Sequence, residues 1–261
     1  MEKISIIIPA YNEEKRIKAT LETYGNFFNK LKKDKKLDYE ILVVINNTHD
    51  KTEEVIKDCQ KRNKNIRYLN FDQGGKGFAI IEGFKDALKR KENSLLGFVD
   101  ADMATLPEAF YALIRNINGF DGLIASRYMK KSIVNPRQSI QRVIVSRIYN
   151  FFMRALLNLH YSDTQCGAKI FKRKTVESIL PELTLSKWAF DVDLLYSSKR
   201  LGFKIIEYPT VWADKEYSKI NLMNAGPWMT MGIIRLRILN SPFKCLIRIY
   251  DKILNKIWKW T

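Results

Sequence analysis

Residues 95–102 read Leu95-Leu96-Gly97-Phe98-Val99-Asp100-Ala101-Asp102. The apolar first part of this stretch is typical of a buried strand, and two acids separated by one residue follow at its carboxyl end. Carboxylates in that position face the crevice in which α/β proteins bind their ligands. Their oxygens suit Mg²⁺ or Mn²⁺, and such a cation in turn binds a diphosphate. The competing interpretation is a strand followed by an acid that caps the next helix.

The chain before the acid pair alternates between strand-like and helix-like segments. Residues 4–8, 40–45 and 66–69 are short apolar runs, and residues 76–90 carry apolar side chains at helical spacing. This order predicts an α/β fold with a mostly parallel sheet, right-handed crossovers and flanking helices. In the second half, residues 122–126 and 204–208 predict further strands.

A capping box is predicted before the second helix. Asp50 and Glu53 have the spacing at which a side chain at each position satisfies a free backbone N–H group of the first turn. We therefore expect Asp50 at the N-cap of that helix.

A polar or glycine-rich loop follows each of the first four predicted strands. These loops are residues 9–14, 46–50, 72–77 and 100–102. Since the carboxyl ends of parallel strands meet at one edge of a sheet, we expect the loops to form one site. In the third loop, glycines let the backbone approach a ligand, and Lys76 adds a positive charge unless it is simply a solvated lysine at a helix start.

Almost all of the formal charge of +17 lies in the second half. Residues 1–125 contain 21 Lys and Arg against 19 Asp and Glu, whereas residues 126–261 contain 24 against 9. Such a field suits nucleic acid, an anionic membrane surface or a phosphorylated substrate. The basic stretches hold no recognisable nucleic-acid-binding motif, so we expect no nucleic acid partner.

Two further segments of the second half have helical periodicity. Residues 138–159 alternate apolar side chains with three arginines, which argue against an ordinary membrane span. From Trp228 onward, apolar and cationic residues alternate in the way of amphipathic helices that lie in a bilayer interface. The alternative is a terminal helix that packs on the domain and exposes its lysines.

Cysteine and histidine usage suggests neither a metal centre nor a covalent nucleophile. Cys59, Cys166 and Cys245 are odd in number and lack metal-ligand spacing, which favours a reducing, cytoplasmic setting. We interpret His49 and His160 as ordinary surface or loop residues. The sequence predicts no secretory signal peptide and no transmembrane helix.

Seven segments together resemble family 2 of the inverting glycosyltransferases and, within it, the dolichyl-phosphate β-glucosyltransferases. Asp163-Thr164-Gln165-Cys166-Gly167 and Trp188-Ala189-Phe190-Asp191-Val192 are the more specific of them. The resemblance implies a GT-A fold (a Rossmann-like α/β fold), a nucleotide-sugar donor, Mg²⁺ or Mn²⁺, and a polyisoprenyl-phosphate acceptor. The segments are SIIIPAYNEEKRI (5–17), GGKGFAI (74–80), DADMATLPE (100–108), ASRY (125–128), DTQCGAKIFKR (163–173), KWAFDVDLLY (187–196), and EYSKIN with WMTMGIIRLRILN (216–221 and 228–240).

The resemblance also implies a donor site at the strand ends. Asp102 would hold the metal, and Asp100 would support the metal shell or bind the ribose. Asn46 stands where relatives commonly have an acid, so an amide replaces the usual acidic contact to the base. The implied donor-binding residues are Pro9, Tyr11, Glu13, Asn46, Gly75, Lys76 and Asp100.

An acceptor site is implied in the basic half. Arg127 would face the acceptor phosphate, and Arg137 or Lys169 would join it through charge-assisted bonds. Asp191 matches the position of the family's base, although a phosphate acceptor is already ionised near neutral pH and needs none. Asp191 could instead orient the acceptor or a basic partner, or simply be an acid at a helix start.

We therefore expect a peripheral enzyme on the cytoplasmic face of a membrane that transfers a hexose from a UDP-sugar to dolichyl or another polyisoprenyl phosphate, for protein N-glycosylation or related glycan assembly. Glucose is the favoured sugar and N-acetylglucosamine the next. Residues 1–225 would form the catalytic domain, with a nucleotide-sugar half (1–125) and an acceptor half (126–225), and residues 226–261 would form basic amphipathic helices at the membrane interface. The alternatives are a family 2 transferase acting on a polysaccharide and, from another class, a nucleic-acid-binding protein. The oligomeric state stays open.

Overall fold

Seven strands form one mixed sheet in the computed structural model, which describes residues 1–136, 140–184, 189–213 and 222–258. The order across the sheet is β3-β2-β1-β4-β7-β5-β8, and all neighbours are parallel except β7, which is antiparallel to β4 and β5. A short pair, β6 with β9, lies outside it. The strands are β1 (Lys3–Ala10), β2 (Asp38–Asn46), β3 (Ile66–Phe71), β4 (Asn93–Phe98), β5 (Gly122–Ser126), β6 (Ile133–Val134), β7 (Lys169–Lys172), β8 (Ile205–Pro209) and β9 (Val211–Trp212).

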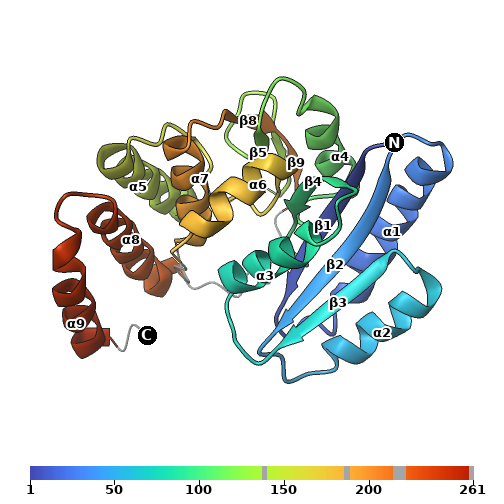
Figure 1. The fold of residues 1–261 in the computed structure, drawn as a ribbon, viewed down its shortest axis with the longest axis horizontal. Coiled ribbons are helices and arrows are strands. Elements are labelled where there is room, and N and C mark those ends of the chain that lie inside the picture. The colour runs from blue at the N-terminus through green and yellow to red at the C-terminus, as the bar shows by residue number, and fades with distance from the viewer. Residues whose placement is uncertain (137–139, 185–188, 214–221, 259–261) are drawn as a thin grey trace.

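Helices cover both faces of the sheet (Figure 1). One face packs against α1, α2 and α4, and the other against α3 and α5 to α8. The predicted α/β fold with a mostly parallel sheet is thereby confirmed. The helices are α1 (Ile17–Lys33), α2 (Thr52–Arg62), α3 (Lys76–Leu88), α4 (Pro107–Asn116), α5 (Ile140–Leu157), α6 (Arg173–Ile179), α7 (Phe190–Arg200), α8 (Leu222–Leu239) and α9 (Ile247–Trp258), with single 3₁₀ turns η1 (Leu180–Glu182) and η2 (Lys244–Leu246).

Strand β1 shows why the sequences of the central strands are unbroken runs of apolar residues. Ile6 and Ile8 contribute to the core layer under α1, while Ile7 contributes to the layer under α3, and all three are fully buried. A strand buried on both faces has no polar side to alternate with. Each such side chain contributes about 1.5–3 kcal/mol through its burial.

The antiparallel strand β7 lies within the segment quoted as DTQCGAKIFKR, for which the sequence predicts no strand. Its residues pair with β4 on one side, Phe98 opposite Lys169, and with β5 on the other, Ile124 opposite Lys169. Gly97 and Gly122 permit this close pairing, because a Cβ atom at either would lie under 3 Å from the backbone of β7. β7 thus brings the loop before it, residues 163–168, beside the end of β4.

The predicted capping box at α2 is wrong. The N-cap of α2 is Lys51, without a side-chain capping bond. Asp50 lies one residue earlier and accepts from the backbone N–H of Thr52 at 2.9 Å. The Glu53 carboxylate is instead engaged by two side chains, Lys57 at 2.8 Å and Asn70 at 2.7 Å.

The last two helices pack on one another at one end of the molecule, beside α5 (Figure 1). Ile233 and Leu236 of α8 belong to the core layer on the α3 face, so α8, which contains the predicted boundary between residues 225 and 226, is joined to the sheet domain. Tyr250 of α9 donates to the Met231 carbonyl at 2.9 Å, and Arg235 forms a bidentate pair with Asp251. None of the helices in the described ranges has both the length and the apolar character required to cross a bilayer.

Candidate active site

A left-handed residue follows each of the four parallel strands β1 to β4. They are Asn12 (φ 52°), Asn47 (φ 48°), Gly75 (φ 127°) and Met103 (φ 61°). Residues other than glycine seldom adopt this conformation, and it persists where surrounding contacts hold it, commonly at functional sites. Each of the four loops singled out by their composition therefore contains a residue with positive φ at the same sheet edge.

Asn46, at the end of β2, ties three of these loops together. Its Nδ2 donates to the Ala10 carbonyl and its Oδ1 accepts from the Gly75 N–H, both at 3.0 Å. Asn46 is 3 % exposed, so its amide bonds protein backbone where the sequence places a nucleotide contact. Its role in this structure is to shape the loops around the site.

Glu13 pairs with Arg16, which the sequence analysis does not single out. The guanidinium donates to both carboxylate oxygens, at 2.7 and 2.6 Å. The bond to Glu13 raises the pKa of Arg16, and the charges of Asp102 and Asp100 add to the increase. Arg16 therefore lies in the field of the acid pair. Pro9 is half-buried in β1, and Tyr11 is 45 % exposed, so Tyr11 offers an aromatic surface beside Glu13.

The acid pair follows β4 as predicted, and its two carboxylates have different partners. Oδ1 of Asp100 lies 2.6 Å from Nζ of Lys76, at the start of α3. Oδ1 of Asp102 accepts from the backbone N–H of Ala104 at 2.9 Å, which turns the chain toward α4. Burial raises the pKa of Asp100, Lys76 opposes the rise, and repulsion from Asp102 adds to it.

Gly167 explains why the segment at residues 163–167 accompanies the acid pair. A Cβ atom at Gly167 would lie 1.8 Å from Oδ2 of Asp100. Any other residue would collide with the carboxylate, so Gly167 sets the orientation of Asp100. Two segments 67 positions apart in the chain thus form one wall of the site.

Mg²⁺ or Mn²⁺ fits the donor set at Asp100 and Asp102. Hard cations take carboxylate oxygens, and Mg²⁺ is commonly held by one or two carboxylates together with substrate phosphates and water. Within the described ranges no group of three or more His, Cys, Asp or Glu residues could hold a metal by itself. Asp102 is the better candidate ligand, because Asp100 is already paired with Lys76.

Asp191, at the start of α7, pairs with Lys169 of β7. The Lys169 ammonium donates to Oδ1 of Asp191 at 2.6 Å and to the Cys166 carbonyl at 2.8 Å. Lys169 has no exposed surface, so where the sequence places it on the acceptor phosphate, the structure buries it against Asp191. Burial favours a higher pKa for Asp191, but the charges of Lys169 and then Lys76 outweigh burial and lower that pKa.

Two close contacts show that the start of α3, with Lys76, lies next to the start of α7, with Asp191. A Cβ atom at Gly77 would lie 2.7 Å from Cβ of Phe190, so the first turn of α3 rests directly on the first turn of α7. The ammonium groups of Lys76 and Lys169 both lie over the Phe98 ring, 5.9 and 5.2 Å from its centroid. The donor and acceptor halves therefore meet at the end of β4.

Arg127 is held in a buried ion pair. Its Nε and Nη2 donate to the two carboxylate oxygens of Asp163 at 2.7 and 2.8 Å. The guanidinium carbon, Cζ, lies 5.1 Å from the centroid of the Trp212 ring. Glu207 of β8 in turn accepts from the backbone N–H groups of Ser162 and Asp163, both at 2.8 Å. The sequence analysis names Asp163 only as part of the segment 163–167 and does not name Glu207 or Trp212 at all, since nothing local signals these pairings.

The remaining predicted residues lie as follows. Arg137 falls outside the described residues. His49 lies in the β2 loop, where its backbone N–H donates to the Asn12 side chain at 2.9 Å, and His160 is exposed. The three cysteines are unpaired, and burial raises the pKa of the Cys166 thiol to about 12.

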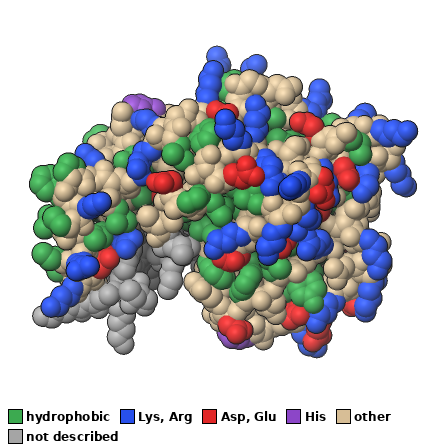
Figure 2. Space-filling model, in the orientation of Figure 1, with side chains coloured by type: hydrophobic (Ala, Val, Ile, Leu, Met, Phe, Trp, Pro, Cys, Tyr) green, Lys and Arg blue, Asp and Glu red, His purple; other side chains and the backbone are tan. Residues whose placement is uncertain are grey.

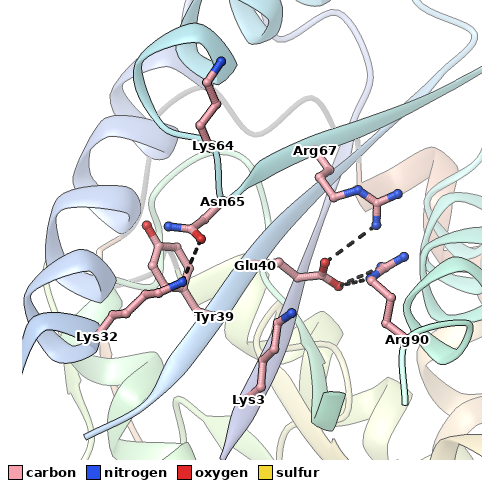
Figure 3. A pocket seen from close by; sticks show the side chains of 8 residues that line it. All are labelled: Lys3, Lys32, Tyr39, Glu40, Lys64, Asn65, Arg67 and Arg90. Carbon is pink, nitrogen blue, oxygen red and sulfur yellow. Dashed lines mark hydrogen bonds and ion pairs between the residues drawn. The ribbon is translucent and has the colours of Figure 1, made fainter. Parts of the chain in front are cut away.

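A separate pocket of about 380 Å³ lies at the opposite edge of the sheet, where β1, β2 and β3 begin (Figure 3). Lys3, Arg67 and Arg90 line it together with Glu40, which pairs with Arg90 at 2.7 Å. Arg67 and Lys3 also have carboxylate partners, Asp86 at 3.3 Å and Glu92 at 3.1 Å. Its cations are largely neutralised, and none of the predicted site residues lines it.

Comparison with known proteins agrees with this geometry. The family described as "Glycosyl transferase family 2" matches residues 5–180. Dolichyl-phosphate beta-glucosyltransferase of Dictyostelium discoideum is 31 % identical over 245 residues, which cover 90 % of this chain and 73 % of that protein. The Homo sapiens protein of the same name is 30 % identical over 259 residues, covering 93 % and 78 %.

The fold is also that of a solved glycosyltransferase. The crystal structure of glucosyl-3-phosphoglycerate synthase from Mycobacterium tuberculosis with Mn²⁺, UDP and phosphoglyceric acid superposes with a TM-score of 0.63 at 17 % identity, covering 91 % of this chain and 78 % of that one. At this identity the likeness concerns the fold, which is GT-A. From the match over residues 5–180 and the two relatives, the chain belongs to glycosyl transferase family 2.

Proposed function

We propose that this chain transfers a hexose from a UDP-sugar to a polyisoprenyl phosphate, with inversion at the anomeric carbon. The observation that carries the proposal is the 2.6 Å pair between Lys169 and Asp191. A sugar or protein hydroxyl must lose a proton as it attacks, so its enzyme needs a base whose pKa lies near the working pH. An Asp191 whose pKa is held low by Lys169 is a poor base, whereas a phosphate acceptor needs none.

The proposed reaction balances without a proton transfer. An anionic oxygen of the lipid phosphate forms a bond to the anomeric carbon, and the bond from that carbon to the UDP oxygen breaks. UDP leaves with the bonding electron pair, and the product is a glycosyl phosphodiester. Lys76 lies beside Asp100 and Arg16 lies in the field of both acids, so these two cations would balance charge on the donor diphosphate. The cation held by Asp102, when bound, stabilises charge on the leaving group.

Relatives and structural neighbours support the donor, the metal and the acceptor. The relatives' name, dolichyl-phosphate beta-glucosyltransferase, supports glucose as the sugar and dolichyl phosphate as the acceptor. N-acetylglucosamine is the second sugar that the donor screen should include. The superposed synthase was crystallised with Mn²⁺ and UDP, and another crystal of it contains Mg²⁺ and UDP. Assembly of glycans for protein N-glycosylation is the process in which we place this product.

A membrane surface is the proposed location of the reaction. Phe243, which directly precedes η2, and Ile249 and Ile253 of α9 are at least half exposed. Figure 2 shows hydrophobic side chains gathered at the end of the molecule formed by these elements, with Lys and Arg between them. Exposed apolar residues rimmed by cations suit an anionic bilayer interface. Tyr250 and Arg235 meanwhile pack α9 onto α8. We therefore propose that one face of α9 packs on the domain and that its exposed face lies in the bilayer interface.

The test is a donor screen with purified protein, Mg²⁺ and dolichyl phosphate, with mass detection of the lipid product. We expect transfer from UDP-glucose, and loss of transfer in Asp102→Asn. UDP–Mn²⁺ binding measured alongside should weaken in that variant, because Asp102 is the better metal candidate. Lys36→Ala, an exposed lysine remote from the strand ends, is the control.

A soluble glycan acceptor provides the contrary outcome. Transfer to a polysaccharide or oligosaccharide, with none to dolichyl phosphate, would assign the chain to the other branch of family 2 and refute the proposed acceptor. Vesicle flotation against an oligonucleotide shift assay tests the basic half separately. Binding to the oligonucleotide alone would contradict the membrane partner.

A further inference from the structure

Helix α5 is apolar on two opposite faces. Its inner face packs into the core through Tyr149, Met153 and Leu157. Its outer face carries Ile144, Ile148 and Phe151 at i, i+4 and i+7, which are 53 %, 53 % and 67 % exposed. A helix of a folded domain ordinarily turns polar residues outward, and a second apolar face indicates an interaction surface.

Arg147 borders this outer face and also contacts the Arg127 cluster. On a helix, residue 147 neighbours residues 144 and 151, at i−3 and i+4. The Arg147 guanidinium lies 5.2 Å from the Tyr128 centroid, and the Arg127 guanidinium lies 5.7 Å from the same ring. The Tyr128 ring therefore contacts both guanidinium groups and links Arg147, at the edge of the apolar face, to Arg127.

The two arginines differ in their charge balance. Arg127 is neutralised by the bidentate bond to Asp163. No carboxylate of the described part of the chain lies within ion-pair distance of Arg147, which is exposed. An uncompensated guanidinium with its planar fork suits a phosphate group better than one already committed to a carboxylate.

The inner face of α5 packs into the same core layer as Phe190, the neighbour of Asp191. The Tyr149 hydroxyl is buried and has no hydrogen-bond partner among the described residues. Burial raises the pKa of Tyr149, and the charge of Asp191 adds to the increase, so the phenol lies within the field of the acceptor-side acid. Asn150 donates to the Ser162 carbonyl at 2.5 Å, which fixes the helix to the loop that holds Asp163.

We propose that Arg147 binds the phosphate of the lipid acceptor, with the outer face of α5 lying against the isoprenoid chain and the surrounding bilayer. This inference rests on the proposed function and adds to it the acceptor-binding residue and surface. The occupant is an isoprenyl phosphate because the site pairs a cation that no carboxylate in the described ranges compensates with an adjacent apolar strip on one helix. A soluble phosphate compound has no group for the strip, and a neutral lipid has none for the cation.

Arg154 offers a matched control. It lies on the same helix, is exposed, and borders the same outer face two turns later, but it contacts neither Tyr128 nor any other ring in the described ranges. Arg147→Ala should raise the KM for polyprenyl phosphate about tenfold to a hundredfold, the value of hydrogen bonds to a charged group. Arg154→Ala should change it about twofold or less. The KM for the UDP-sugar and the melting temperature should stay the same in both, and Arg147→Lys should fall between, because it keeps the charge and loses the fork.

Equal effects of Arg147→Ala and Arg154→Ala would overturn the proposal, since Arg147 would then be one part of a diffuse positive field. Flotation with phosphatidylcholine vesicles separates the phosphate sources: vesicles carry either polyprenyl phosphate or phosphatidylserine at equal surface charge. Arg147→Ala should weaken binding to the former far more. Equal weakening on both would assign Arg147 to bilayer headgroups and refute the acceptor role.

The apolar strip has its own test. Phe151→Ser should impair transfer to long-chain polyprenyl phosphate and leave transfer to a short, water-soluble isoprenyl phosphate unchanged, whereas Arg147→Ala should impair both. Equal impairment by Phe151→Ser on both acceptors would contradict the assignment of the outer face. Wild-type protein that binds UDP–Mn²⁺ but glycosylates neither acceptor would refute the proposed function instead, while the vesicle comparison would still report on Arg147.

Discussion

Lys169 donates to Asp191 across 2.6 Å in a place where the lysine has no contact with solvent. A buried ion pair of this kind is costly to break on one side only, because the remaining charge then lacks both water and a partner. The pair also joins β7 to α7. It therefore contributes to the shape of the acceptor side as well as to the charge of Asp191.

Lys169→Met should lower the free energy of unfolding by about 3–5 kcal/mol, because it leaves the Asp191 carboxylate buried and unpaired. Adding Asp191→Asn should recover most of this loss, since no uncompensated charge then remains. Urea denaturation of wild type, both single variants and the double variant measures the coupling. Additive losses in the double variant would contradict the pairing.

The stability of the pair should depend on pH in a defined direction. The folded-state pKa of Asp191 is lowered, so its stabilising effect is complete above the ordinary pKa of about 3.9 and is lost as the pH falls through the folded value. In Lys169→Met, burial should raise the pKa of Asp191 instead. The variant should then be least stable at neutral pH, where the carboxylate is ionised without its partner. The stability gap between wild type and variant should be widest near pH 7 and narrow toward pH 3, measured by urea denaturation. A gap independent of pH would argue against an ionised Asp191.

Gly167→Ala should disable the donor side. The added methyl group collides with Oδ2 of Asp100 and must displace that carboxylate. A displacement of about 1 Å at a reacting centre costs about a hundredfold in kcat/KM. We expect that loss together with weaker UDP–Mn²⁺ binding in calorimetry.

Gly83→Ala provides the control for Gly167→Ala. Its Cβ atom would lie 2.6 Å from Cγ2 of Ile7, a comparable clash in the core between α3 and β1. It should cost about 1–3 kcal/mol of stability and leave UDP–Mn²⁺ affinity unchanged. Normal UDP–Mn²⁺ affinity in Gly167→Ala would refute the role of Gly167 beneath Asp100.

Asn46→Ala should loosen the donor loops. It leaves the Gly75 N–H and the Ala10 carbonyl without their partner, at about 1–3 kcal/mol for each buried group. The melting temperature should fall and the KM for the UDP-sugar should rise. Asn116→Ala, which removes an exposed bond at the end of α4, should change stability by about 0.5 kcal/mol or less. Identical behaviour of the two variants would contradict the loop-tying role of Asn46.

Much of the donor side could be predicted because its signals are local. A few consecutive β-branched residues, as at residues 4–8, are enough to predict a strand that is buried on both faces. The loop that carries site residues follows such a strand directly in the sequence. The acid pair follows β4 directly, so its place at the sheet edge needed no knowledge of distant partners. Strand order then brought four loops together.

The acceptor side could not be predicted to the same depth, because its contacts join distant segments. Arg127 pairs with Asp163, 36 positions away, and Asp163 is held by Glu207, 44 further on. A basic half rich in cations does not tell which of them is paired. Lys169 looks like any other cation of that half until β7, four residues long, places it inside the protein.

The insertion of β7 between β4 and β5 limits where the chain could be split into two separately expressed fragments. Residues 1–125 resemble a self-sufficient module of alternating strands and helices. In the sheet of the described chain, however, β4 and β5 do not pair with each other, and β7, which follows both in the sequence, pairs with each of them. A fragment ending at residue 125 would leave two adjacent strand edges open, and such edges associate with other chains. Expressed separately, the two pieces should aggregate, and expressed together they should regain activity by supplying the missing strand in trans.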